Sequence, residues 1–270
     1  MERRLARRTR LSKAEPGRIR QFFSRLGPGL VTGAADDDPS GIGTHSQVGA
    51  EFGYGLSWTF LFSFPLMVAI QEVAAEIGRV TGAGIARNLK RHYPRPVLFG
   101  IVALLLVANI INLGADLAAM GAAVTLLAGG PATLYTILIG LLCVALEVFI
   151  PYGRYASILK WTTLSLFAYV AVVAVAHVPW GEALASLVIP RIEFSGAYAT
   201  AVVAILGTTI SPYLFFWQAA QEIEEQHRHK VKPLCVVPSE AGPELARIRI
   251  DTLTGMAFSS IISLAIVFAT

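Results

Sequence analysis

Seven long apolar stretches constrain this chain more than any other feature of its sequence. A helix needs about 20 apolar residues to cross the hydrocarbon core of a bilayer. Stretches of suitable length lie at about 27–50, 56–78, 97–127, 132–149, 156–178, 198–221 and 252–270. With 54% hydrophobic and 15% charged residues, the chain is too apolar for an ordinary soluble domain. We therefore expect an all-α polytopic membrane protein with a transmembrane domain over residues 26–270. Because the last stretch ends at Thr270 without a polar flank, we also expect a C-terminally truncated chain.

The basic residues predict how the spans are oriented. Lys and Arg number nine in residues 1–25, five in 79–95, two at Arg154 and Lys160, and five in 228–249, and Arg191 stands apart. With the N-terminus inside, almost all of them lie on the cytoplasmic side, as the positive-inside rule requires. We expect a cytoplasmic basic arm over residues 1–25 and a multi-pass protein of a bacterial-type cytoplasmic (inner) membrane. The lipid bilayer is thus the expected partner, and nucleic acid is not.

The first apolar stretch is interrupted by three carboxylates. The sequence from Gly33 to Gly41 reads GAADDDPSG. A charge at the bilayer centre costs at least about 2.5 to 3.5 kcal/mol, so such a run persists only where it faces water, protein or a bound cation. Pro39 removes a backbone donor and disfavours helix at Asp38. We expect the helix to unwind here. The alternative is that the aspartate run is a loop between two shorter segments, but residues 27–35 alone are too short to cross the membrane.

The sixth stretch contains a similar interruption. Residues 207–212 read GTTISP within an apolar run. A simple proline kink is the alternative, because Ser and Thr can satisfy the carbonyls that proline frees. Matching breaks in corresponding helices are, however, typical of transporters built from inverted repeats, which bind ions at the midplane. Freed carbonyls, hydroxyls and one carboxylate would give an oxygen-lined cation site.

Several motifs resemble the NRAMP family of divalent metal transporters. They include the glycine- and aspartate-rich first stretch, QVGAEFGY at 47–54, GRVTG at 78–82, DLA at 116–118, and the break in the sixth stretch. The resemblance implies a LeuT-type fold of two inverted five-helix repeats, in which helices 1 and 6 are discontinuous. This chain would hold the first repeat, helix 6 and part of helix 7. The resemblance also implies a divalent metal ion as substrate, no cofactor and no enzymatic activity.

The metal site that the resemblance implies has lost its sulfur ligand. The family holds metal with Asp, Asn, an Ala carbonyl and Met, and the matching residues here are Asp38, Gly41, Thr208 and Ser211. With a carbonyl near Ala35, the donors are all oxygen. Such a site favours Mg²⁺, Ca²⁺ or Mn²⁺ over softer metals. The sequence is therefore similar to the NRAMP-related magnesium transporters, and we expect a carrier of Mg²⁺ or Mn²⁺.

Proton coupling is expected to be weak or absent. Three proton-path groups of the family are replaced, two of them by His45 and Tyr213. Asp116 is retained, and Asp36 and Asp37 could take over the role of the lost groups. Together with His45 and Tyr213, these aspartates form the candidate proton or ion pathway. Asn112, on the same helix as Asp116, could hydrogen-bond across helices or line the permeation path.

Other functions remain open at this stage. One alternative is a proton-coupled Mn²⁺/Fe²⁺ transporter like other members of the family, and another is a metal-binding membrane receptor or subunit that does not transport. A sodium-coupled carrier of organic solutes is disfavoured, since three aspartates would repel a substrate carboxylate. Whether the chain forms a homo-oligomer is also open.

Overall fold

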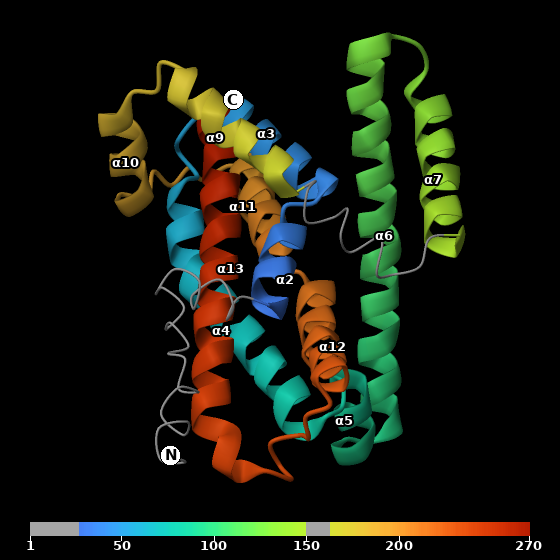
Figure 1. Ribbon diagram of the computed structural model, residues 1–270. Coiled ribbons are helices and arrows are strands. Elements are labelled where there is room, and N and C mark those ends of the chain that lie inside the picture. The colour runs from blue at the N-terminus through green and yellow to red at the C-terminus, as the bar shows by residue number, and fades with distance from the viewer. Residues whose placement is uncertain (1–26, 150–162) are drawn as a thin grey trace, which may run out of the picture.

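The computed structural model describes residues 27–149 and 163–270, and every regular element within them is a helix (Figure 1). The helices are α2 (Pro28–Asp36), α3 (Pro39–Phe52), α4 (Trp58–Thr81), α5 (Ile85–His92), α6 (Arg95–Ala128), α7 (Ala132–Phe149), η2 (Thr163–Leu166), α9 (Phe167–Val175), α10 (Trp180–Val188), α11 (Gly196–Thr209), α12 (Pro212–His229), η3 (Pro238–Glu240) and α13 (Ala241–Ala269). The predicted arm over residues 1–25 lies outside the described residues, as does part of the predicted span 156–178.

Within the described residues, five helical stretches are long and apolar enough to cross a membrane. They are Trp58–Thr81, Arg95–Ala128, Ala132–Phe149, Gly196–His229 and Pro238–Ala269. The first predicted span is absent from this set because it is divided into two short helices, α2 and α3. The structure therefore confirms an all-helical membrane protein in which the first and sixth predicted helices are discontinuous.

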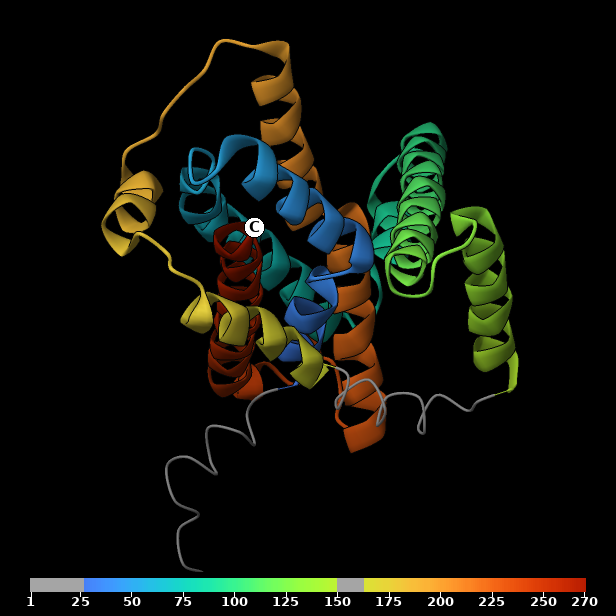
Figure 2. The same cartoon turned by 90° about the horizontal axis from the view of Figure 1, so that it is seen from above.

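Helix α13 lies at the centre of the main bundle and packs against α2, α3, α4 and α9 (Figures 1 and 2). Small residues allow α2 to approach it closely. A Cβ atom on Gly33 would lie 2.1 Å from the carbonyl oxygen of Gly255, and one on Gly29 would lie 2.7 Å from the carbonyl carbon of Asp251. Larger residues at these two positions would force α2 away from α13.

Helices α6 and α7 form a hairpin beside the main bundle (Figure 2). The hairpin contacts the other helices through α3, α5 and α12. Many of its apolar side chains are exposed, for example Leu104 at 73% and Leu127 at 91%. Such exposure suits a helix surrounded by lipid, because lipid tails solvate leucine well.

Several segments that the sequence placed in connections are helical, among them α5 between the second and third predicted spans. Helix α13 begins at Ala241 rather than near residue 252, and α10 lies within the predicted connection 179–197. The early start of α13 has a physical reason, since Glu244, Arg247 and Asp251 all find polar partners on neighbouring elements. Hydropathy alone marks where the apolar part of a helix begins, and misses a polar extension of this kind.

Candidate metal-binding site

The break between α2 and α3 is built by Asp38 and Pro39. Helix α2 ends at Asp36, and α3 begins at Pro39 with Asp38 in an extended conformation (φ −75°, ψ 167°) as its N-cap. The Asp38 carboxylate accepts a hydrogen bond from the backbone N–H of Gly41 at 2.7 Å. Proline is favourable at the first position of a helix, and aspartate is among the best N-cap residues. The same two residues therefore end one helix and start the next.

The break between α11 and α12 also places a proline at the start of the new helix, but the Ser211 side chain does not cap α12. Helix α11 ends at Thr209, and α12 begins at Pro212 with Ser211 in an extended conformation (φ −75°, ψ 129°). The single hydroxyl hydrogen of Ser211 is shared between the carbonyls of Gly207 and Thr208, at 2.9 and 2.7 Å. These contacts satisfy carbonyls that the end of α11 leaves without a helical partner.

Neutral donors surround the carboxylate of Asp38. One oxygen accepts from the Gly41 N–H and from the Ser40 hydroxyl at 2.8 Å. The other accepts from the Tyr213 hydroxyl at 2.7 Å and from the Asn112 side-chain amide at 3.1 Å. Among the described residues, no Lys, Arg or His forms an ion pair with Asp38. Asp38 is thus held in place without a positive partner.

A second carboxylate, Asp116, belongs to the same group of residues. One of its oxygens accepts from the backbone N–H of Ser40 at 2.9 Å, and the other accepts from Asn112 at 3.3 Å. Asn112 and Ser40 therefore bridge Asp38 and Asp116. Elements α3, α6 and α12 all contribute to this group, which we call the Asp38 cluster: Asp38, Ser40, Asn112, Asp116 and Tyr213.

The other predicted site residues lie around the breaks with different roles. Ala35 lies in the last turn of α2, whose carbonyls have no helical partners. Gly41 contacts Asp38 through the backbone N–H of Gly41, which donates to the carboxylate. The Thr208 hydroxyl donates to the carbonyl of Ile205 at 2.9 Å, which leaves its lone pairs free. From the second half of helix 6, the residue that bonds to Asp38 is Tyr213, which the sequence had placed in the pathway.

Asp36 and Asp37 point away from the Asp38 cluster and toward α13. Asp36 accepts from the Ser259 hydroxyl, and Asp37 from the Ser263 hydroxyl at 3.0 Å. Both side chains are more than nine-tenths buried. Their partners are on α13, so the three consecutive aspartates divide between two environments.

His45 is buried in an apolar setting. Its ring lies edge-on to Phe60, with 5.1 Å between ring centroids, and its Nδ1 has no hydrogen-bond partner among the described residues. The side chain is 3% exposed. Its contacts in this conformation are thus with the core rather than with the Asp38 cluster.

Ser40 and Asn112 are the members of the cluster that the sequence did not place among the site residues, although it left open that Asn112 hydrogen-bonds across helices or lines the path. Asn112 and Asp116 are four residues apart, so both lie on one face of α6, and this spacing was a usable signal. In the part of the chain that the structure describes, no group of three or more His, Cys, Asp or Glu side chains could hold a metal. A metal bound near Asp38 would need neutral oxygen ligands as well as carboxylate.

The fold and the cluster together define a membrane protein with the broken-helix LeuT architecture. The profile of the Nramp family (natural resistance-associated macrophage protein-like) matches residues 29–270. This chain belongs to the Nramp family.

Comparison with known proteins supports this assignment. The chain is 30% identical over 202 residues to the divalent metal cation transporter MntH of Verminephrobacter eiseniae, covering 70% of this chain and 44% of that protein. It is 28% identical over 215 residues to the metal transporter Nramp5 of Oryza sativa subsp. japonica, covering 74% of this chain and 38% of that protein. The chain thus spans about half or less of the length of these curated relatives.

The fold is shared with solved transporters. A crystal structure of the manganese transporter of Eremococcus coleocola, in complex with an aromatic bis-isothiourea substituted compound, superposes with a TM-score of 0.73 at 18% sequence identity. The match covers 94% of this chain and 52% of that one. At this identity the similarity establishes the fold, and the relatives are metal transporters rather than enzymes.

Proposed function

We propose that this chain carries the metal site of a secondary transporter that moves divalent cations, Mg²⁺ or Mn²⁺, across the cytoplasmic membrane by alternating access. The observation that carries the proposal is the Asp38 carboxylate, held between two broken helices by donors that are all neutral in the part of the chain that the structure describes. A carboxylate without a positive partner inside a membrane attracts a cation. The names of the relatives, divalent metal cation transporter and metal transporter, agree with this class of substrate.

The proposed ligands are oxygen atoms. Asp38 provides the charge, Ala35 and Gly41 provide backbone oxygens, and Thr208 and Ser211 provide a carbonyl and hydroxyls. Because the two hydroxyls donate their hydrogens to nearby carbonyls, their lone pairs remain available to a cation. Hard cations prefer such ligands, which favours Mg²⁺ and Mn²⁺ over thiophilic metals. Manganese is also the substrate named for the solved structural relative.

We propose that transport needs little or no proton coupling. Moving a divalent ion inward through about 100 mV supplies roughly 4.6 kcal/mol, enough for accumulation on the order of a thousandfold. The Asp36 and Asp37 side chains bond to serines of α13, and the His45 ring packs against Phe60, so none of these three side chains forms a hydrogen bond with the Asp38 cluster. Metal-driven acidification of proteoliposomes held at a fixed membrane potential would contradict this part of the proposal.

Isotope flux separates transport from binding. The protein is reconstituted in liposomes, and ⁵⁴Mn²⁺ uptake is followed with an inside-negative potential. We expect uptake that saturates with metal and is inhibited by Mg²⁺. A membrane receptor would bind metal and show no net uptake. Uptake that Mg²⁺ does not inhibit would favour the Mn²⁺/Fe²⁺ type of transporter.

A further inference from the structure

Helix α5 is a short amphipathic helix that follows α4 at one end of the bundle (Figure 1). Arg87, Lys90 and Arg91 are three and four residues apart, so they share one side of α5, and all three are exposed. Ile85 and Leu89 are also four residues apart and form the opposite side, where both are half-buried. Basic and apolar residues on opposite faces are typical of a helix that lies in a membrane interface.

Hydrogen bonds from Asn88 hold α5 against the end of α4. The side-chain amide of Asn88 donates to the hydroxyl oxygen of Thr81 at 3.0 Å and to the carbonyl of Ala83 at 2.8 Å. Between the two helices, Gly82 adopts the left-handed conformation with φ 63°, which ends α4 and turns the chain. Helix α5 also packs against α6 and α12. It is therefore a fixed part of the bundle rather than a loose connection.

The positive charge on and beside α5 has no counter-charge in the part of the chain that the structure describes. Positions 77–115 contain no Asp or Glu. The exposed side chains of Arg87, Lys90, Arg91 and Arg95 form no ion pair with a described residue. The ion-paired carboxylates of α12, which packs against α5, have basic partners on α12 and α13 instead. Basic residues clustered directly after a membrane span attract anionic lipid headgroups.

An apolar cavity of about 340 Å³ lies beside α5, between α4 and α12. Ile70, Val73 and Ile77 of α4 line one side of it, and Ile85 of α5 and Phe215 of α12 complete the wall. Every residue that lines the cavity is apolar. Val73 is 56% exposed, so the cavity opens to the outer surface of the bundle. A cavity of this size and chemistry suits an apolar ligand that enters from the lipid.

The cavity has the depth of one lipid leaflet. Its lining on α4 runs from Ala69, twelve residues before the last helical residue Thr81, to Ile77, four residues before it. At about 1.5 Å per residue, these side chains lie roughly 6 to 18 Å from the end of the helix. The hydrocarbon of one leaflet is about 15 Å thick, half of the membrane core. Because α5 begins just after α4 ends, its basic residues lie at the level of the headgroups.

We propose that α5 and this cavity bind one anionic phospholipid of the cytoplasmic leaflet. One acyl chain lies in the cavity between α4 and α12, and the phosphate lies within reach of the long basic side chains of α5. The bound lipid thus joins α5 to α12, the second half of helix 6. A second copy of this chain fits the surface less well, because a symmetric contact would place the same positive residues opposite one another. Neither metal binding nor transport is needed for this site.

Native mass spectrometry of the full chain in detergent tests the site, with dioleoylphosphatidylglycerol as the probe. The parent should bind one molecule of this lipid more tightly than dioleoylphosphatidylcholine, which has no net charge. Glycerophosphoglycerol, the same headgroup without acyl chains, should not displace it. In the double variant Arg87→Gln, Arg91→Gln, the dissociation constant of the first phosphatidylglycerol should rise about tenfold, because two charges near the headgroup are lost.

A matched control removes two other exposed arginines. Arg191 and Arg249 have side chains that are 65% and 75% exposed, and neither lines the cavity. The double variant Arg191→Gln, Arg249→Gln should bind phosphatidylglycerol as the parent does. The cavity is tested separately by Val73→Trp, whose larger side chain occupies the space of the acyl chain and should weaken binding by about tenfold without changing any charge. If that variant does not fold, Ala69→Phe, at another exposed position of the lining, replaces it.

Three outcomes overturn the lipid site. Equal phosphatidylglycerol affinity in the parent and in the Arg87→Gln, Arg91→Gln variant would show that α5 does not select the headgroup. Unchanged affinity in the cavity-filling variant would show that the acyl chain lies elsewhere. The same spectra report the mass of the protein. A dimer that the cavity-filling variant converts to a monomer, with no change in bound lipid, would assign the cavity to a second copy of this chain.

Discussion

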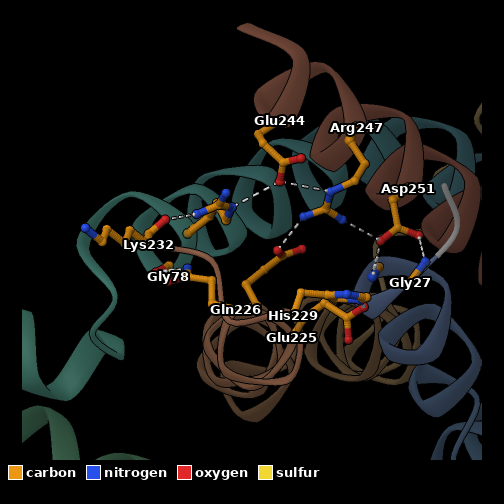
Figure 3. A network of polar contacts seen from close by, with 12 residues as sticks. Gly27, Gly78, Glu225, Gln226, His229, Lys232, Glu244, Arg247 and Asp251 are labelled. Atoms are coloured by element: carbon orange, nitrogen blue, oxygen red, sulfur yellow. Dashed lines mark hydrogen bonds and ion pairs between the residues drawn. The ribbon is translucent and has the colours of Figure 1, made fainter. Parts of the chain in front are cut away.

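The Asp38 cluster and a second group of charged residues, which joins α2, α4, α12 and α13, use the same kind of residue in opposite ways. We call the second group the α2 latch (Figure 3): Arg79, Glu222, Glu244, Arg247 and Asp251. Asp38 receives four hydrogen bonds from neutral groups and no contact from a basic side chain of the described residues. In the latch, Glu222, Glu244 and Asp251 all lie within 4.0 Å of Arg247. A carboxylate with a built-in positive partner holds helices together, whereas one without such a partner is free to bind a cation from outside.

The two regions also differ in access. Asp38, Asn112 and Tyr213 are only partly buried, while Asp251 and Glu222 of the latch are almost wholly so. Burying an unpaired charge is costly, and the buried carboxylates of the latch lie against Arg247. Asp36 and Asp37 belong to neither kind, because they are buried against serines of α13 and form no ion pair with a basic side chain of the described residues. We infer that a positive partner distinguishes the latch carboxylates from Asp38.

The largest effect is expected from Asp38→Asn. This change keeps the size of the side chain and removes the charge that attracts the metal, so Mn²⁺ affinity should fall by about a hundredfold or more. Calorimetric titration of the purified protein measures it. Glu147→Gln, which neutralises an exposed carboxylate on α7, is the control and should bind normally. Equal Mn²⁺ affinity in the Asp38→Asn and Glu147→Gln variants would show that the Asp38 carboxylate does not bind the metal, and the contrast between the two regions would be wrong.

Glu222→Ala should affect stability rather than binding. It leaves Arg247 without its closest partner, and breaking a buried ion pair costs about 3 kcal/mol in the free energy of unfolding. Thermal unfolding in detergent should show a clearly lower midpoint, with the Mn²⁺ dissociation constant unchanged. Glu224→Ala alters an exposed carboxylate on the same helix and should leave the midpoint in place. Loss of metal binding without loss of stability would contradict the assignment.

Ser211→Met should change selectivity at the site. A thioether favours softer metals, so the ratio of Cd²⁺ to Mg²⁺ affinity should rise by about tenfold. Competition binding against Mn²⁺ provides the measurement. Ser211→Ala serves as the control because it removes the hydroxyl without adding sulfur. If Ser211→Met retains the parental selectivity, Ser211 does not face the metal.

The smallest effect is expected from Tyr213→Phe. It removes one hydrogen bond to Asp38, worth about 1 kcal/mol, and should change Mn²⁺ affinity by about fivefold. Tyr135→Phe on α7 is the control. An effect as large as that of Asp38→Asn would mean that Tyr213 does more than orient the carboxylate.

The sequence predicted those features that depend on local chemistry. Pro39 and Pro212 determine where two helices begin, and their neighbours Asp38 and Ser211 occupy the positions before the new helices. Such breaks can be recognised from adjacent residues, because proline and helix-capping residues act within one turn. The discontinuity of helices 1 and 6 followed from these signals.

The features that the sequence left open or missed depend on long-range contacts. Asn112 reaches Asp38 across 74 positions, and Asp251 caps Gly29 across 222 positions. The three aspartates at 36–38 are identical in the sequence, yet the winding of the chain directs two of them to α13 and one to the cluster. Hydropathy and spacing cannot determine which partner each carboxylate meets, because that depends on how distant helices pack.

Anomalous scattering from Mn²⁺ in crystals of the metal-loaded protein tests the central claim most directly. The account predicts a peak about 2.0 to 2.6 Å from a carboxylate oxygen of Asp38, between the α2–α3 and α11–α12 breaks. A peak at the α2 latch instead, or a metal-loaded protein with no peak beside Asp38, would contradict it.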